Sequence, residues 1–279
     1  MIETSLSRRA PAVRLGWRRT LRMLPLSLLM TPLLLFLVLP LVALVLRLDV
    51  AYLAANLADL LVIQAISLSM LTTLIATTIA VLFGTPLAYL LARTKFRGRA
   101  IVDTLIDLPM VLPPSVAGIA LLMAFGRRGL FGSYLSDAGV EIAFTQIAVV
   151  LAQVFVAAPY FVKAATAGFV KVERELEHAA ALDGASQWNV FRFVTLPLSW
   201  PALFGGMVMT WARALGEFGA TIIFAGNFPG RTQTMPLAIY LGFERDLDLA
   251  LTLAVILLSI SFLVLVTVKG ALRQRIGAV

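Results

Sequence analysis

The apolar positions of this chain gather in long runs without charged residues, and short polar segments separate the runs. A helix crosses a membrane with about 20 apolar residues, because the hydrocarbon core of a bilayer is about 30 Å thick. Five runs of about this length contain no charged residue, and a sixth is interrupted only by Arg213 and Glu217. The pattern therefore predicts an all-α integral membrane protein with six membrane-spanning helices. We place the spans at about 23–46, 61–92, 108–126, 142–165, 201–225 and 248–268. The second is too long for one upright helix, and we expect it to tilt or to lie partly at the membrane surface.

The composition agrees with a single membrane domain. Hydrophobic residues make up 60% of the 279 positions and charged residues only 14%, whereas a soluble domain carries about a quarter of charged residues. No polar stretch is long enough to fold alone, so we expect one domain over 23–269, a basic arm at 1–22 and a tail at 270–279. The chain has no cysteine and one histidine, which excludes disulfides, iron–sulfur clusters and a histidine-based metal site.

The positive charges indicate the orientation of the chain. Arginines and lysines cluster before the first predicted span, between spans two and three, between spans four and five, and after span six. The alternate loops hold few of them: Arg47, Arg127, Arg128, Arg231 and Arg245. By the positive-inside rule, both termini and the polar loop at 171–200 are predicted to be cytoplasmic. Attraction to anionic lipid headgroups accounts for the net charge of +8, so we expect no nucleic acid as a partner.

The polar loop at 171–200 has the pattern of two short helices. Glu173–Asp183 contains strong helix formers, and Gly184 permits the left-handed residue or tight turn that ends a helix. Ser186 can cap a second helix, which we expect to run to Val194 and to stop before Pro197. Two short helices joined at a glycine form a compact knob that could fill a groove in another protein.

The same loop carries a recognisable spacing: Ala-Ala-x-x-x-Gly, nine residues, then an aliphatic residue, x, Leu and Pro. It reads Glu177-His178-Ala179-Ala180-Ala181-Leu182-Asp183-Gly184, followed by Val194-Thr195-Leu196-Pro197. This spacing resembles the coupling loop of permease subunits of ATP-binding-cassette (ABC) importers. The resemblance implies a bundle like that of type I importer permeases, with the loop seated in a groove of a separate ATPase subunit. The implied ATPase-coupling residues are Glu177, His178, Ala179, Ala180, Gly184, Val194, Leu196 and Pro197. The family usually has Glu where this chain has His178.

Two features within the apolar segments are candidates for the pathway or for packing. Arg213 and Glu217 lie one helical turn apart, and charges in a span normally face the bundle interior or water. They could fix helix packing as a buried ion pair, or they could line the route of an anion, and both interpretations remain open. Pro113 and Pro114 belong to a proline-rich start of the third span. Because proline leaves backbone groups unpaired, we expect this segment to pack inside the bundle.

A second resemblance concerns the substrate. The segments from Arg213 to Thr221, from Ala225 to Tyr240 and from Leu108 to Gly118 are similar to the molybdate branch of these permeases. Sulfate, thiosulfate and tungstate permeases share a similar core and remain alternatives. The resemblance implies a homodimer, two copies of the ATPase subunit and an external substrate-binding protein, which we expect Asn227 and Arg231 to face.

The chain itself shows no sign of enzymatic activity. It contains no Gly-x-x-x-x-Gly-Lys-Ser/Thr phosphate loop and no apparent pair of nucleophile and base. We therefore expect no catalytic residues and no bound cofactor, with ATP used by the partner subunit. A secondary transporter is a weaker alternative, because such proteins show inverted repeats with broken helices and we find no repeat. A purely structural membrane subunit is the remaining alternative.

Overall fold

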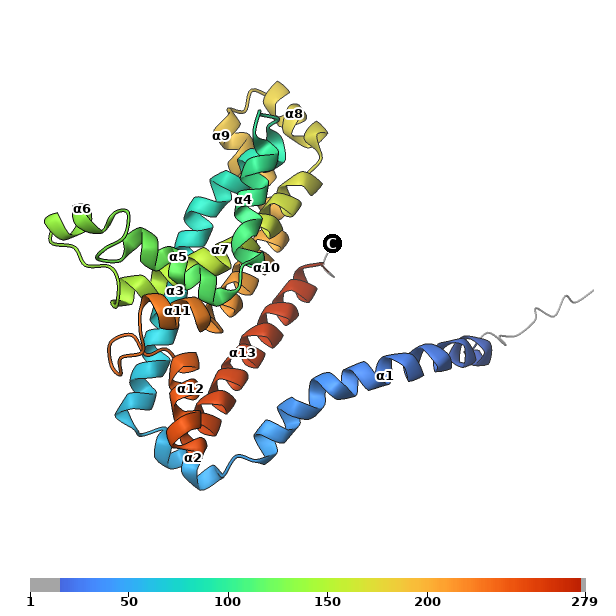
Figure 1. Cartoon of the computed structure of the whole chain (residues 1–279). Coiled ribbons are helices and arrows are strands. Elements are labelled where there is room, and N and C mark those ends of the chain that lie inside the picture. Colours follow the sequence, from blue (N-terminus) through green and yellow to red (C-terminus); the bar gives the residue numbers. More distant parts are fainter. Residues whose placement is uncertain (1–15, 277–279) are drawn as a thin grey trace, which may run out of the picture. The chain divides into compact units, whose positions relative to one another are not determined.

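The computed structural model describes residues 16–276, and its regular structure over this range is entirely helical (Figure 1). The predicted all-α fold is confirmed. The chain forms two compact units, one up to Leu48 and one from Asp49 onward. Of the predicted basic arm, residues 1–15 lie outside the described range.

The first unit is one long helix, α1 (Gly16–Leu46). Its part from Leu28 to Leu46 is long and apolar enough to cross a membrane, and none of it is buried within the chain. Large aliphatic and aromatic side chains such as Leu33, Phe36 and Leu39 are more than half exposed. A helix that is apolar on every face is suited to lipid or to the inside of an assembly.

The second unit holds the remaining helices. They are α2 (Val50–Asn56), α3 (Leu60–Arg93), α4 (Arg99–Val111), α5 (Pro114–Phe125), α6 (Gly132–Asp137), α7 (Gln146–Lys171), α8 (Arg174–Leu182), α9 (Gln187–Val190), the π-helix η1 (Phe191–Thr195), α10 (Leu196–Leu215), α11 (Gly219–Phe224), α12 (Met235–Arg245) and α13 (Leu247–Ile276).

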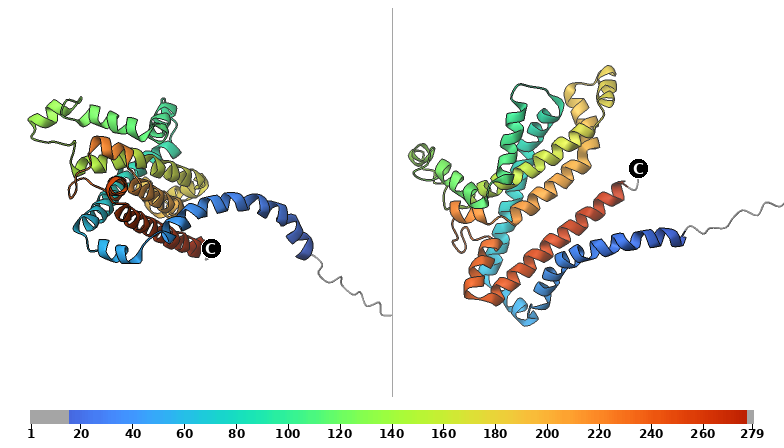
Figure 2. Two further views of the ribbon diagram at one scale, coloured as in Figure 1. Left: turned by 60° about the horizontal axis from the view of Figure 1, so that its bottom comes forward. Right: turned by 45° about the vertical axis from the view of Figure 1, so that its right-hand side comes forward.

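Helix α7 lies at the centre of this unit and packs against both α3 and α10, as the views of Figure 2 show. Small residues permit the close approach. A Cβ atom added at Gly206 of α10 would lie 2.7 Å from the Cβ of Ala164, and one added at Gly168 would lie 2.6 Å from that of Ala202. Phe161 and Phe169 of α7 are fully buried in the same core. These three helices form the rigid frame from which the polar loop projects.

Within residues 16–276, five helical segments are long and apolar enough to cross a membrane, and the pair α4 and α5 makes a sixth if it is one span. The pair is bent by 116°, so the prediction of one continuous helix over 108–126 is wrong. The break falls at Leu112, which is extended (φ −64°, ψ 136°) because it precedes Pro113. Pro109, by contrast, lies inside α4. The predicted proline-rich start is therefore a bend between two helices.

The predicted span over 201–225 also differs from the structure. The helix is continuous from Gln187 to Leu215, and α11 then starts at Gly219 after a short break. Gly216 and Phe218 have non-helical backbone angles at this break. The helix that carries the predicted span therefore begins before residue 201, and the predicted range contains an interruption.

Candidate functional site

The first half of the polar loop folds as predicted. Helix α8 ends at Leu182, and Gly184 adopts the left-handed conformation with φ of +87°. The amide of Ala185 donates to the carbonyl of Ala180 and the amide of Gly184 to that of Ala181, both at 3.1 Å. This pair of bonds is a Schellman motif, which satisfies the last carbonyls of a helix. The predicted glycine turn is confirmed.

The second half differs from the prediction. The Ser186 side chain does accept from the amide of Asn189 and caps α9, but the helix does not stop before Pro197. It continues through η1 into α10, and the Leu196 amide donates to the Phe191 carbonyl, a π-type bond. In an α-helix the ring of Pro197 would meet the carbonyl four residues earlier, and the wider π turn lets the helix continue. The loop is thus one separate helix and an extension of α10.

The outer surface of the loop presents large apolar side chains among polar and charged ones. Leu182, Trp188 and Phe193 are 89%, 64% and 67% exposed, and Figure 1 shows α8 and α9 together at one end of the long helices α7 and α10. Large apolar side chains gathered on a surface mark interaction sites. Among the residues of the motif, the exposed ones are His178, Ala179, Gly184 and Pro197, and the half-buried ones are Glu177, Ala180, Val194 and Leu196.

Glu177 points into the molecule instead of toward the outer surface. Its Oε1 lies 2.7 Å from Nη2 of Arg93 and accepts a 2.6 Å hydrogen bond from the Thr195 hydroxyl. Arg93 is the last residue of α3, and its Nη2 also donates to the carbonyl of Val172 at 3.0 Å. In the sequence, Arg93 is one of the positive charges between predicted spans two and three that indicate the orientation of the chain. The one feature of the local sequence that could have pointed to Arg93 is its position at the end of an apolar run.

Arg213 and Glu217 form the predicted ion pair, with Nη2 and Oε2 2.8 Å apart. The two residues do not share one continuous helix, because α10 ends at Leu215. The other oxygen of Glu217 accepts from the amide of Ala220 in α11 at 2.8 Å. The Glu217 side chain is only 1% exposed and that of Arg213 is 27% exposed. The pair therefore links α11 to the end of α10. This geometry agrees with the interpretation that Arg213 and Glu217 fix helix packing as a buried ion pair.

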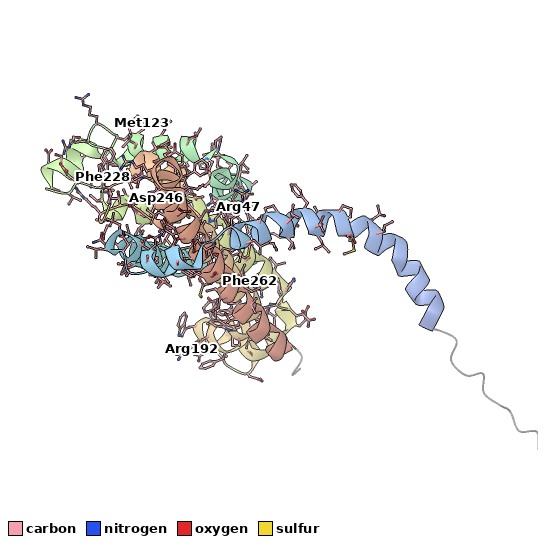
Figure 3. All side chains as sticks on the ribbon, turned by 90° about the horizontal axis from the view of Figure 1, so that it is seen from below. Arg47, Met123, Arg192, Phe228, Asp246 and Phe262 are labelled. Atoms are coloured by element: carbon pink, nitrogen blue, oxygen red, sulfur yellow. The ribbon has the colours of Figure 1, made fainter. Side chains whose placement is uncertain are left out.

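The other predicted residues are spread over the second unit. Pro113 and Pro114 are exposed within the single chain, so their packing inside the bundle stays a prediction. A Cβ atom at Gly219 would lie 2.6 Å from that of Pro114, so the start of α5 contacts the start of α11. Asn227 turns inward and donates to the Leu237 carbonyl at 3.3 Å, whereas Arg231 is exposed. Figure 3 places Phe228, next to Asn227, in a different region from Arg192 of the polar loop.

A third group of charges was not predicted. Lys163 of α7 lies 2.8 Å from carboxylate oxygens of both Asp103 and Asp107 on α4. These side chains are 33%, 50% and 43% exposed, in that order. These two ion pairs join α4 to α7. Helix α4 itself has no fully buried residue. No cluster of three or more histidine, cysteine or carboxylate side chains that could hold a metal ion occurs among the residues described.

Residues 84–276 match the family of binding-protein-dependent transport system inner membrane components. The chain belongs to this family. It is therefore a multi-pass inner-membrane permease and a non-catalytic subunit of an ABC transporter.

Proteins with similar sequences align with most of this permease. It is 44% identical to the molybdenum transport system permease protein ModB of Mycobacterium tuberculosis over 87% of this chain and 91% of the relative. It is 39% identical to ModB of Escherichia coli K12 over 77% of this chain and 96% of the relative. A protein of Chlorokybus atmophyticus named as a probable sulfate transport system permease is 36% identical over 75% of this chain and 73% of the relative.

Solved structures agree with the fold of the permease. A bacterial ABC transporter that imports the polysaccharide alginate has a chain with a TM-score of 0.72 and 15% identity, which covers 92% of this chain and 98% of that chain. The MetNI methionine ABC transporter, in an inward-facing conformation, gives a TM-score of 0.59 at 16% identity, over 77% of this chain and 95% of that chain. The predicted bundle of a type I importer permease is confirmed by this likeness.

Proposed function

We propose that this permease moves molybdate, or a similar tetrahedral oxyanion, across the inner membrane by alternating access, driven by a separate ATPase subunit. The observation that carries this proposal is the 44% identity to a molybdenum transport permease over 87% of the chain. The chain covers 91% of that relative, so the likeness is not confined to the coupling loop that many importers share.

The proposed assembly holds two copies of the permease, two copies of the ATPase subunit and an external substrate-binding protein, with the pathway between the two permease copies. The positive-inside distribution of charge supports cytoplasmic termini and a cytoplasmic polar loop. The exposed side chains of Leu182, Trp188 and Phe193 support docking of the ATPase subunit on that loop. Arg231, which is exposed at the other predicted face, is the better of the two candidates for contact with the binding protein.

The cycle follows from this arrangement. ATP closes the two ATPase subunits, the two polar loops move with them, and the membrane helices open outward to receive the anion; hydrolysis returns them to the inward-open state. ATP is used by the ATPase subunit, and the permease contributes no cofactor. A ligand shifts a conformational equilibrium only by its differential affinity for the two states, and in this proposal the contact between ATPase subunit and loop supplies the difference.

The test is uptake of radiolabelled oxyanion by proteoliposomes that contain the permease, its ATPase subunit and its binding protein. We expect ATP-dependent molybdate uptake that an equal concentration of sulfate does not compete away. The sulfate alternative is favoured by the 36% identity to a sulfate permease, and uptake of sulfate in preference to molybdate would establish it. Uptake without ATP would contradict both and favour a secondary transporter.

The role of the loop is tested separately at Gly184. Gly184→Val places a β-branched residue at φ of +87°, which L-residues avoid, and we expect it to abolish ATP-driven uptake while membrane insertion is kept. Nothing lies within 4 Å of an added Cβ atom there, so the effect comes from the backbone. Gly184→Asn is the matched control, because asparagine tolerates the left-handed conformation. Normal uptake by Gly184→Val would count against the loop.

A further inference from the structure

We infer that Arg93, Glu177 and Thr195 form a clamp that passes the movement of the polar loop into α3 and α10. This inference rests on the proposed function, because it assigns a role in coupling to a loop that an ATPase subunit moves. In this assignment Glu177 is a positioning residue inside the permease and does not touch the ATPase subunit. The contact surface is left to the exposed residues around it, such as His178 and Leu182.

The clamp joins three segments of the permease. Arg93 ends α3, Glu177 belongs to α8, and Thr195 lies in η1 at the start of the membrane helix α10. One carboxylate oxygen of Glu177 binds both partners, at 2.7 Å and 2.6 Å. Helix α8 is also linked to α3 by Arg174, which donates to the Arg93 carbonyl, and to its neighbours by the backbone at its two ends. The carboxylate thus gives α8 direct attachments to two long helices.

The three side chains of the clamp are shielded from water. The Arg93 and Glu177 side chains are only 10% and 14% exposed, and Thr195 is fully buried. Charges shielded from water attract each other more strongly than exposed ones, where the solvent screens the pair. The Glu177 oxygen that binds Arg93 and Thr195 thus lies inside the permease, where water screens the ion pair only weakly.

Other contacts also hold Arg93 in place. Arg93 also donates to the carbonyl of Val172 at the end of α7, and Arg174 of α8 donates to the Arg93 carbonyl at 3.3 Å. The last turn of α3 is thereby bound to the end of α7 and to the start of α8. An arginine in the last turn of a helix is also favoured by the helix dipole.

Aromatic rings form an apolar layer beside the clamp. Tyr89, one turn before Arg93, meets Phe169 of α7 at a centroid distance of 5.5 Å and Phe191 of η1 at 5.1 Å, edge to face in both contacts. Trp188 stacks on Phe191 at 5.7 Å. Rings in these arrangements pack favourably, so the base of the loop resists deformation. A push on the exposed end of the loop is therefore delivered to α3 and α10 together.

The test uses substitutions that break the clamp without changing the exposed surface. In the full importer, we expect Arg93→Gln and Thr195→Val to keep the ATPase subunit bound and hydrolysing ATP, while molybdate uptake per ATP hydrolysed falls about tenfold. Arg93→Lys should recover part of the loss. Arg97→Gln is the matched control, because Arg97 is an exposed arginine four residues further on, and it should keep the ratio of the unchanged protein.

A ratio of uptake to hydrolysis separates coupling from a purely structural role, which would lower the amount of assembled importer and leave the ratio unchanged. An unchanged ratio in Thr195→Val would therefore overturn the inference. Loss of the ATPase subunit from Thr195→Val would also overturn it, because Thr195 is buried and the clamp would then only shape the docking surface.

A second readout does not depend on the identity of the anion. The chain has no cysteine, so spin labels can be attached at Ala181→Cys on α8 and at Leu82→Cys on α3, both exposed positions. We expect ATP to shift both labels in the unchanged importer, and only the α8 label in Arg93→Gln. A shift of the α3 label in Arg93→Gln would overturn the clamp. Failure of molybdate uptake in the unchanged importer would refute the proposed substrate and leave this readout decisive for the clamp.

Discussion

Two arginine–glutamate ion pairs with almost equal N–O distances have different roles in this molecule. The side-chain atoms of Arg93 and Glu177 are 2.7 Å apart, and the two residues are 84 positions apart in the sequence. Those of Arg213 and Glu217 are 2.8 Å apart, and the residues are four positions apart. In each pair the glutamate binds a second donor. For Glu177 that donor lies on another long helix, and for Glu217 it is the first turn of the next short helix. The first pair connects elements, and the second shapes one break in the chain.

The pairs also differ in which partner is shielded. Both members of the long-range pair keep slight exposure, at 10% and 14%, but Glu217 is 1% exposed while Arg213 is 27% exposed. A buried charge that loses its partner is strongly destabilising, because no water replaces the lost interaction. Stability should therefore depend most on the local pair, and coupling should depend most on the long-range pair.

The largest expected loss of stability comes from Arg213→Ala. It leaves the buried carboxylate of Glu217 with one hydrogen bond, to the Ala220 amide, and should lower the free energy of unfolding by about 3 kcal/mol. Thermal unfolding of the purified permease, followed by fluorescence, measures the change.

The matching double variant is Arg213→Ala/Glu217→Gln. Glutamine is neutral and keeps an oxygen for the Ala220 amide, so we expect it to recover part of the loss. Replacing Glu217 by alanine is a poorer control, because it also removes the bond that begins α11. If the double variant is no more stable than Arg213→Ala, the cost does not come from an unpaired buried carboxylate.

These two pairs also show how far the sequence alone could lead. The pair at Arg213 was predicted because a spacing of four residues places side chains on one helical face. The turn at Gly184 and the cap at Ser186 were predicted because each depends on the chemistry of one residue and its neighbours. Such local features leave a local signal, and the apolar runs of the spans do the same.

The features that were missed depend on distant parts of the chain. Nothing near Arg93 indicates that its partner lies 84 positions away. Helix α4 was missed because Asp103 and Asp107 interrupt its apolar pattern, and their partner Lys163 belongs to another helix. The continuation of the helix past Pro197 requires the π turn at η1, which residue preferences do not predict.

The next largest effect is expected at Glu177. Glu177→Ala removes the acceptor of both Arg93 and Thr195 and should lower the free energy of unfolding by about 2 kcal/mol, the typical size of hydrogen bonds to charged groups. Glu177→Gln keeps an acceptor oxygen and should lose about half as much. Both values come from the same unfolding measurement. Equal losses from the two substitutions would mean that side-chain volume, and not the hydrogen bonds, stabilises the base of the loop.

A smaller effect is expected where one lysine binds two carboxylates. Asp103→Asn should cost less than about 0.5 kcal/mol, because Asp107 still pairs with Lys163 and the group is partly exposed. Asp103→Asn/Asp107→Asn should cost about 1 kcal/mol and loosen α4, which faster amide hydrogen exchange along α4 would reveal. If the single substitution costs as much as the double, the two carboxylates act together and neither can replace the other.

The smallest effect is expected at the exposed pair of Arg127 and Glu141. Their side-chain atoms are 2.7 Å apart, as close as those of Arg93 and Glu177, but they are 76% and 60% exposed. Water and salt screen such a pair, so Arg127→Ala should change the free energy of unfolding by no more than about 0.5 kcal/mol. Because the two pairs have the same length, the comparison isolates burial and connectivity. A loss as large as that of Glu177→Ala would show that bond length alone sets the contribution, and the distinction between the arginine–glutamate pairs would then fail.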